Sequence, residues 1–330
     1  MKPRKAVMEI DDHGNNYLTK KYIRDLCAEL GLYEIPKLVE TLYLNFKGIK
    51  MIQCLDEYIN LKVLYLNDNL ISKIENLEKL KQLKMLYLQH NVIEKIEKLS
   101  VLENLTILDL SSNKITVIEN IATLTKLSTL NVSNNLIYSI ADIQELKLCP
   151  SIQTLNLDLN QFEDPNGFVD FFGELKNIIT LNLNGNPVLK NIDSSRKEII
   201  GVMPHLSFYN DLPVTELERK KSEAYSSGGY REENKVKEKY FEEQKQKKAI
   251  EKEKNKKYDD WQRSMQKKHL AMIAEKEKKE NIGPNEEEDK KENINIKDAE
   301  KEILSEVIAK TESVQSNQNI NLSKDYNHPD

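Results

Sequence analysis

Cysteine, histidine and glycine are scarce in this chain, and their scarcity excludes several classes of protein. The three cysteines, Cys27, Cys54 and Cys149, are odd in number and widely spaced, which argues against a disulfide framework and against a zinc site. The ten glycines form no phosphate-binding loop, and the five histidines form no Ser-His-acid or metal-ligand arrangement. We therefore expect no catalytic residue, no metal and no cofactor, and a protein that is not an enzyme.

Long apolar runs are also missing. No stretch approaches the length needed to cross a bilayer, and the first ten residues lack the apolar segment of a signal peptide. We expect a cytoplasmic protein that does not bind membranes.

Apolar and charged residues are distributed unevenly along the chain. Residues 1–216 carry nearly all the Leu and Ile periodicity, whereas Lys, Glu, Gln and Asn dominate the rest. Residues 217–280 contain 20 Lys or Arg and 14 acidic residues, and residues 281–330 contain 6 and 12. Because the two signs alternate at helical spacing, a solvated helix is favoured over nucleic-acid binding.

A repeat with a period of about 22 residues dominates positions 39–143. One unit has apolar residues at Leu61, Leu64, Leu66, Ile71, Ile74 and Leu77, with an asparagine at Asn69. Steps of one period reproduce this pattern in five gapless units, and only Lys47 replaces the asparagine. Two further units start at Ile152 and Ile178, after slightly longer spacings. The pattern predicts an α/β leucine-rich-repeat solenoid of about seven repeats over residues 39–194.

Each repeat is expected to add one short parallel strand to a concave sheet, with the paired leucines directed into the core. The asparagine that follows the strand lies where the chain turns. There its amide can bind main-chain groups that have no partner in the sheet. This structural role is assigned to Asn69, Asn91, Asn113, Asn135, Asn160 and Asn186.

The ends of a solenoid need caps that cover its first and last core residues. Residues 17–38 predict a helical N-terminal cap in which Thr19 is the N-cap and Gly31 ends the helix. Asp164 and Pro165 predict a helix on the convex side of the sixth unit. Residues 195–214 predict a C-terminal cap with the apolar residues Ile199, Ile200, Met203, Leu206 and Phe208.

The remaining segments have few core residues. We expect residues 1–16 to be disordered, residues 215–280 to form a charged helix, and residues 281–330 to be an acidic disordered tail. Gly228 and Gly229 predict a turn between the cap and the charged helix. The helix lacks a sustained heptad, which favours a solvated helix, with a coiled coil as the alternative. An amphipathic stripe over residues 296–310 is typical of segments that fold into a partner's groove.

The repeat register also identifies the residues that face the concave side. Its first half is apolar and aromatic, and its second half is polar. The strand propensity of Tyr and Val is one explanation, but propensity would distribute these residues evenly, so we favour a protein-binding surface. The predicted binding residues are Tyr43, Phe46, Val63, Tyr65, Leu70, Met85, Tyr87, Val92, Ile107 and Asp109.

Two segments outside the generic repeat resemble the dynein axonemal assembly factor 1 family. The first is Thr-Leu-Tyr-Leu-Asn-Phe-Lys-Gly at residues 41–48, and the second is Glu-Ala-Tyr-Ser-Ser-Gly-Gly-Tyr at residues 223–230. The resemblance covers about residues 17–232. Leu212 stands where that family is expected to have a basic residue, and the resemblance ends near residue 240.

The resemblance implies a binding scaffold for the cytoplasmic preassembly of axonemal dynein arms in cells with motile cilia. Implied partners are axonemal dynein heavy or intermediate chains, co-assembly factors and chaperones. The implied locations are the cytoplasm and also the cilium. We expect a monomeric solenoid. A light-chain-like subunit of axonemal dynein and a regulatory subunit of a protein phosphatase are the alternatives, because both use repeats of this length.

Overall fold

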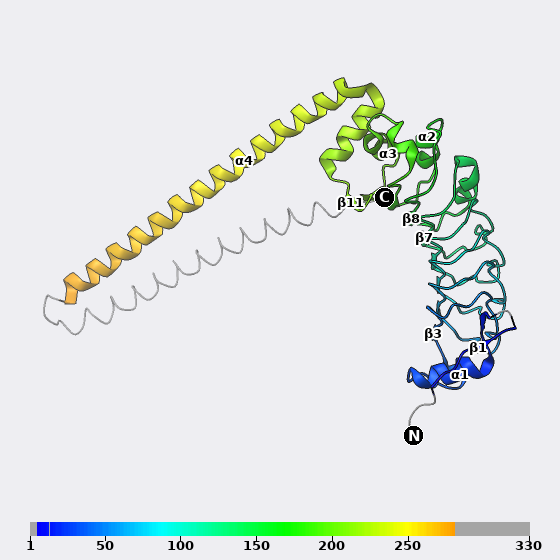
Figure 1. Cartoon of the computed structure of the whole chain (residues 1–330). Coiled ribbons are helices and arrows are strands. Elements are labelled where there is room, and N and C mark those ends of the chain that lie inside the picture. Colours follow the sequence, from blue (N-terminus) through cyan, green and yellow to red (C-terminus); the bar gives the residue numbers. More distant parts are fainter. Residues whose placement is uncertain (1–4, 13, 281–330) are drawn as a thin grey trace. The chain divides into compact units, whose positions relative to one another are not determined.

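The computed structural model describes residues 5–12 and 14–280, which belong to two compact units divided between Gln244 and Lys245. The first unit contains a solenoid whose strands lie along the inner side of its arc (Figure 1). The predicted fold of leucine-rich repeats is thus confirmed.

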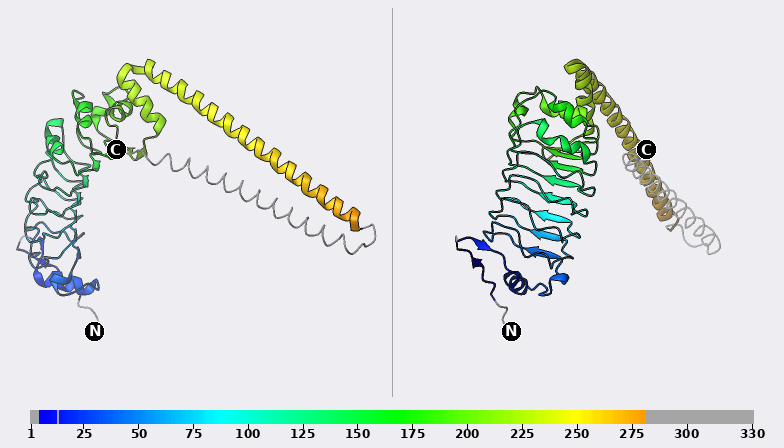
Figure 2. Two further views of the ribbon diagram at one scale, coloured as in Figure 1. Left: turned by 180° about the vertical axis from the view of Figure 1, so that it is seen from behind. Right: turned by 90° about the vertical axis from the view of Figure 1, so that its right-hand side faces the viewer.

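Seven strands of three residues each follow the predicted register. They are β3 (Thr41–Tyr43), β4 (Val63–Tyr65), β5 (Met85–Tyr87), β6 (Ile107–Asp109), β7 (Thr129–Asn131), β8 (Thr154–Asn156) and β9 (Thr180–Asn182). Neighbouring strands are parallel and pair at equivalent repeat positions, such as Leu42 with Leu64. The strands lie side by side in one sheet (Figure 2). The central leucine of every strand is buried in the core, and the residues on either side are half-buried or exposed, except for the buried Asn182.

The first helix has the capping residue that the sequence predicts. Helix α1 (Lys20–Glu29) begins at Thr19, whose hydroxyl accepts a hydrogen bond from the Tyr22 amide at 3.1 Å. Gly31 follows the helix at φ +69°, a conformation that favours glycine. A 3-10 helix, η1 (Pro36–Leu38), then leads into β3.

The expectation of disorder over residues 1–16 is wrong for the part that forms a hairpin. Strands β1 (Glu9–Ile10) and β2 (Asn16–Tyr17) pair antiparallel. The Asn16 side chain donates a hydrogen bond to the Lys47 carbonyl at 2.8 Å, in the repeat that lacks the ladder asparagine. Because the hairpin is too short to show hydrophobic alternation, no pattern in these residues predicts it.

The longer repeats carry their extra residues on the convex side. The fifth has a 3-10 helix, η2 (Ile140–Leu148), and the sixth has α2 (Phe168–Gly173). Asp164 is not the N-cap of α2, because its carboxylate binds the Asn166 amide and Gly167 occupies the cap position instead. The predicted helix therefore exists but starts later than expected.

The C-terminal cap comprises η3 (Pro187–Lys190), α3 (Ser195–Val202), β10 (Phe208–Tyr209) and β11 (Leu212–Pro213). Strand β10 extends the sheet beside β9, and β11 pairs antiparallel with β10. Phe208 pairs with Thr180 and its side chain is 45% exposed, whereas Tyr209 is buried. Of the apolar residues expected in the cap, Phe208 is therefore exposed, and its neighbour Tyr209 is buried instead. The reason is that β10 continues the alternation of outward and inward side chains in β9.

Helix α4 (Glu216–Glu280) is interrupted at the predicted turn, where Gly229 has φ +67°. The turn does not separate the cap from the charged helix, since helix lies on both sides of it. Residues 216–244, here called the C-terminal clasp, form an arm before the turn and an arm after it within the first compact unit. The folded domain therefore extends beyond the predicted limit of the cap at residue 214.

Residues 245–280 belong to the second unit and are helical. Their described side chains are mostly exposed, and Tyr258 and Trp261 lie with ring centroids 5.9 Å apart. The predicted acidic tail over residues 281–330, with its candidate helix at 296–310, lies outside the described residues.

Candidate protein-binding surface

Three tyrosines at equivalent positions of β3, β4 and β5 form a stack on the concave face. The ring centroids of Tyr43 and Tyr65 are 5.0 Å apart, and those of Tyr65 and Tyr87 are 4.7 Å apart, with the ring planes within 6° of parallel. This spacing follows from the distance between neighbouring strands of a sheet. Burial raises the pKa of the Tyr87 hydroxyl, and the nearby Tyr65 and Asp109 raise it further.

A second apolar row runs beside the tyrosines. Val63, Met85 and Ile107 pair at the first position of their strands and are each half-buried. The Tyr87 hydroxyl lies 3.8 Å from the Met85 sulfur, so the two rows touch. The structure thus brings six of the predicted binding residues together on one face of the sheet.

Phe46, Leu70 and Val92 lie beyond the ends of the strands, at the margin of this surface. Phe46 is 70% exposed and has φ +55°. The equivalent residues of the next four repeats also have a left-handed backbone conformation, but their side chains are polar. They are Asp68, His90, Ser112 and Asn134. A bulky aromatic side chain is unusual in this conformation, and such outliers are found preferentially at functional sites.

Asp109 marks the boundary between the two halves of the concave face. Its carboxylate accepts hydrogen bonds from the Ser111 amide at 3.0 Å and the Ser111 hydroxyl at 2.7 Å. Its other oxygen accepts from Asn131 at 3.2 Å. Because these groups already occupy the carboxylate, Asp109 begins the polar half of the face rather than extending the apolar half.

The asparagines assigned a structural role form a continuous ladder between repeats. The Asn113 amide donates to the Leu88 carbonyl of the preceding repeat and to the Leu110 carbonyl of its own, at 3.0 and 2.9 Å. Its oxygen accepts from the Ile93 amide at 3.0 Å. Equivalent bonds to carbonyls of both repeats are made by Asn69, Asn91, Asn135, Asn160 and Asn186. The ladder holds the strands in place, because the side-chain nitrogen of each of these asparagines is bound to carbonyls of two repeats.

The C-terminal clasp contains an arrangement that sequence reasoning missed. Lys197 on α3 lies over the rings of Tyr225 and Tyr230, 5.2 and 4.8 Å from their centroids. The buried carboxylate of Glu233 binds Lys197 at 2.6 Å and Lys221 at 3.0 Å. Burial raises the pKa of Glu233, but hydrogen bonds from the two lysines outweigh burial and leave this pKa lowered. The Gly-Gly-Tyr motif was the available signal, because its turn brings Tyr230 to Lys197.

A second set of contacts fixes the first arm of the clasp to the cap. Arg196 binds the Glu218 carboxylate with two nitrogens, at 2.6 and 3.0 Å, and the Tyr209 carbonyl at 2.9 Å. Arg219 donates to the carbonyls of Met203 and Leu206. These bonds make the first arm an integral part of the cap.

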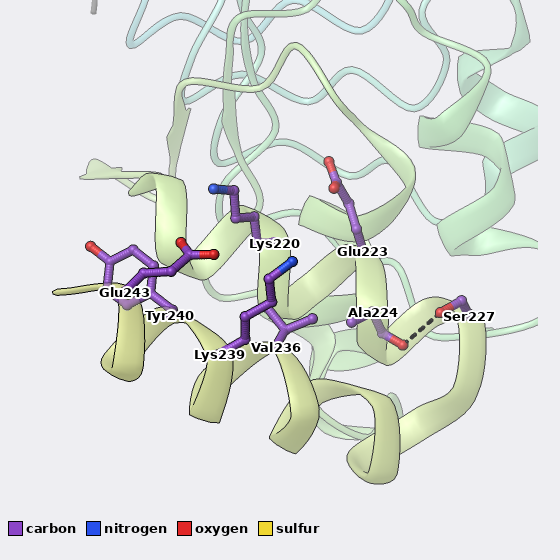
Figure 3. Close-up of a pocket in the computed structure, with 8 residues that line it drawn as sticks. All are labelled: Lys220, Glu223, Ala224, Ser227, Val236, Lys239, Tyr240 and Glu243. Atoms are coloured by element: carbon purple, nitrogen blue, oxygen red, sulfur yellow. Dashed lines mark hydrogen bonds between the residues drawn. The ribbon is translucent and has the colours of Figure 1, made fainter. Parts of the chain in front are cut away.

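An open cleft of about 440 Å³ lies between the two arms of the clasp (Figure 3). Ala224, Val236 and Tyr240 form its apolar surface, and lysines and glutamates surround it. Across residues 5–12 and 14–280 no cluster of three or more His, Cys, Asp or Glu residues could hold a metal ion. No helix in this part of the chain is long and apolar enough to cross a membrane.

Part of the repeat region matches a known family. Residues 59–101 and 103–148 match the family of leucine-rich repeats in two copies. Among solved structures, two internalins from Listeria monocytogenes are 25% and 22% identical, with TM-scores of 0.45 and 0.43. They are matched by 57% and 64% of this chain, over 50% and 82% of their own chains.

Curated relatives are more similar in sequence. The leucine-rich repeat-containing protein ODA7 of Chlamydomonas reinhardtii is 52% identical over 212 residues, which is 64% of this chain and 49% of that protein. Dynein axonemal assembly factor 1 of Rattus norvegicus is 58% identical over 67% of this chain and 34% of its own length. The human protein is 59% identical over 64% of this chain and 29% of its own length. The matches span half or less of these relatives. Over about two thirds of its length, this leucine-rich-repeat chain is therefore a homologue of dynein axonemal assembly factor 1 and ODA7.

Proposed function

We propose that this chain is a non-catalytic scaffold that binds a protein partner during the preassembly of axonemal dynein arms in the cytoplasm. The role in dynein assembly is carried over from the names of the relatives. The binding role is supported by the tyrosine stack on the concave face, which is the observation that carries the proposal. Proposed partners are axonemal dynein heavy or intermediate chains, co-assembly factors and chaperones, and the axoneme is a second proposed location.

The working surface consists of Tyr43, Tyr65 and Tyr87 with Val63, Met85 and Ile107. Tyrosine is enriched at the energetic centres of protein interfaces because it combines a large apolar ring with a polar hydroxyl. The rings are already stacked and ordered before binding, so little side-chain entropy is lost when a partner covers them.

The proposal is tested by affinity isolation from the cytosol of ciliated cells, using the full chain and the double variant Tyr65→Ala/Tyr87→Ala. The variant should lose axonemal dynein subunits and assembly factors but stay folded, with its free energy of unfolding lowered by roughly 1–3 kcal/mol, because two ring stacks are removed. Asn131→Ala/Asn156→Ala is the matched control, because these residues occupy the equivalent positions in the polar half of the face. Equal capture by both variants would contradict the role of the tyrosine stack.

Deleting the gene for this chain in the same cells distinguishes the assembly role from the alternatives. An assembly factor is needed before transport, so dynein heavy chains should disappear from isolated axonemes while their transcripts persist. A light-chain-like subunit should instead co-purify with the axoneme in a fixed ratio to heavy chain. Intact dynein arms together with a displaced phosphatase would overturn the proposal in favour of a phosphatase subunit.

A further inference from the structure

Strand β3 is the last strand of the nine-stranded sheet and pairs on one side only, with β4. The Glu40 carbonyl accepts from Val63, and the amides of Leu44 and Phe46 donate to Tyr65 and Asn67. The even-numbered residues therefore direct their backbone groups toward β4. The amides and carbonyls of Thr41, Tyr43 and Asn45 point to the opposite side, and no hydrogen bond within the described part of the chain reaches them on that side.

The N-terminal cap covers the core beneath β3 but leaves this edge unpaired. Leu18, Ile23 and Leu26 are buried in the core cluster. The hairpin β1–β2 reaches the first repeat through a bridge between Asn16 and Ile49, after the strand has ended. Natural proteins usually protect an edge strand with charge, proline, a bulge or a covering segment. Among residues 41–45 only the shortness of the strand provides such protection.

Three apolar side chains on or near this strand are exposed. Leu38 before the strand is 48% exposed, Tyr43 on the strand is 42% exposed, and Phe46 after the strand is 70% exposed. Tyr43 is also the open end of the tyrosine stack, since one ring face lies on Tyr65 and the other has no aromatic neighbour in the described residues. An added strand would continue the stack at Tyr43.

We propose that a partner adds an extended segment to the sheet beside β3, hydrogen-bonded to the outward backbone groups of Thr41, Tyr43 and Asn45. The segment carries an aromatic or flat apolar side chain that stacks on Tyr43, at the spacing of neighbouring strands. Its residues on the opposite face are small or polar, because the helical cap already closes the core below. This site shares Tyr43 with the proposed concave surface but does not depend on which protein the concave surface binds.

A library of random octapeptides displayed on phage tests this proposal with the full chain as the target. Enriched peptides should alternate aromatic or apolar residues with small or polar residues. Synthetic versions should lose at least about tenfold in affinity when the inward-facing amides are N-methylated, because methylation removes hydrogen bonds without removing side chains.

Variants of the edge provide the matched control. Thr41→Pro removes an outward N–H and no bond to β4, which edge strands tolerate, whereas Thr41→Val keeps the N–H. We expect binding to weaken at least about tenfold for Thr41→Pro and to change little for Thr41→Val. If Thr41→Pro does not fold, the N-methylated peptides on the unaltered chain decide the question.

Three results would overturn strand addition: no enrichment, full affinity after N-methylation, or equal binding by the folded Thr41→Pro and Thr41→Val variants. The concave surface is tested separately, because Tyr87 lies two strands from the edge. Loss of dynein-subunit capture by the Tyr65→Ala/Tyr87→Ala variant together with failure of the peptides would reject the edge site alone.

Discussion

Gly201 on α3 lies against the backbone of Ser222 on the first arm of the C-terminal clasp. A β-carbon at Gly201 would lie 2.8 Å from the Ser222 carbonyl oxygen and 2.1 Å from the Ser226 hydroxyl. Ser222 is fully buried by this contact. The two helices can therefore approach this closely only because Gly201 has no side chain.

Gly201→Ala should loosen the clasp. An alanine in a helix is normally more stable than a glycine by about 0.5–1 kcal/mol, but overpacking costs about 1–3 kcal/mol. We expect net destabilisation in urea unfolding and faster proteolysis within residues 216–244. In the control Gly173→Ala, the new β-carbon lies 3.2 Å from a side-chain atom of Val202 and 3.5 Å from its carbonyl oxygen, so a smaller effect is expected. A stabilised Gly201→Ala variant would show that the arm does not need this contact.

Asn113→Leu should lower the free energy of unfolding by roughly 2–4 kcal/mol, because it leaves the buried Ile93 amide without its acceptor and removes two bonds to carbonyls. Asn186→Leu is the comparison within the same chain, since the Asn186 oxygen has no hydrogen-bond partner among the residues that the structure describes. Its cost should be smaller. Chemical denaturation of both variants measures the difference, and equal costs would contradict the assigned role of the oxygen.

Phe46→Asn should raise the stability of the chain and weaken partner binding. Asparagine tolerates the left-handed conformation better than phenylalanine, and Phe46 is mostly exposed, so thermal stability should rise by about 0.5–1 kcal/mol. Partner capture should fall, because the aromatic ring at the margin of the surface is lost. His90→Asn, at the equivalent position two repeats later, should leave capture unchanged. A destabilised Phe46→Asn variant would show that the ring is held by packing.

Asp158→Asn should stabilise the chain at neutral pH. Burial raises the pKa of the Asp158 carboxyl, while a hydrogen bond from the Asn184 backbone lowers it and the nearby Asp211 raises it. A raised carboxyl pKa means that ionisation opposes folding, so the native chain loses stability as pH rises above the ordinary Asp pKa of about 4. The melting temperature of the variant should therefore exceed that of the native chain at pH 7, with a smaller gap near pH 3. A gap independent of pH would exclude ionisation as the cause.

The sequence predicts the solenoid well because its period is a packing requirement. Leu64, Leu66 and Ile71 recur at the same positions of successive units, since each repeat must fill the same space beside its neighbour. The same register identifies the outward residues, and the tyrosine stack follows from it without further assumption.

The clasp and the hairpin could not be predicted in this way. The clasp depends on contacts between residues far apart in the sequence, such as Lys197 with Tyr230 and Glu233, and its surface is as charged as a solvated helix. The exposure of Phe208 was missed because pairing with β9, and not the hydrophobicity of its own residues, decides which side chains of β10 face outward. The local amino-acid composition does not indicate such pairings.

The asparagine ladder also makes the chain modular. The Leu88 carbonyl accepts from both Asn91 and Asn113, and the Leu110 carbonyl from both Asn113 and Asn135, so every internal repeat meets its neighbours through the same bonds. A duplicated copy of residues 84–105 would find each of these partners in place. Gain or loss of whole repeats can thus widen or narrow the recognition surface in steps of about 4.8 Å, one strand at a time, with both caps unchanged.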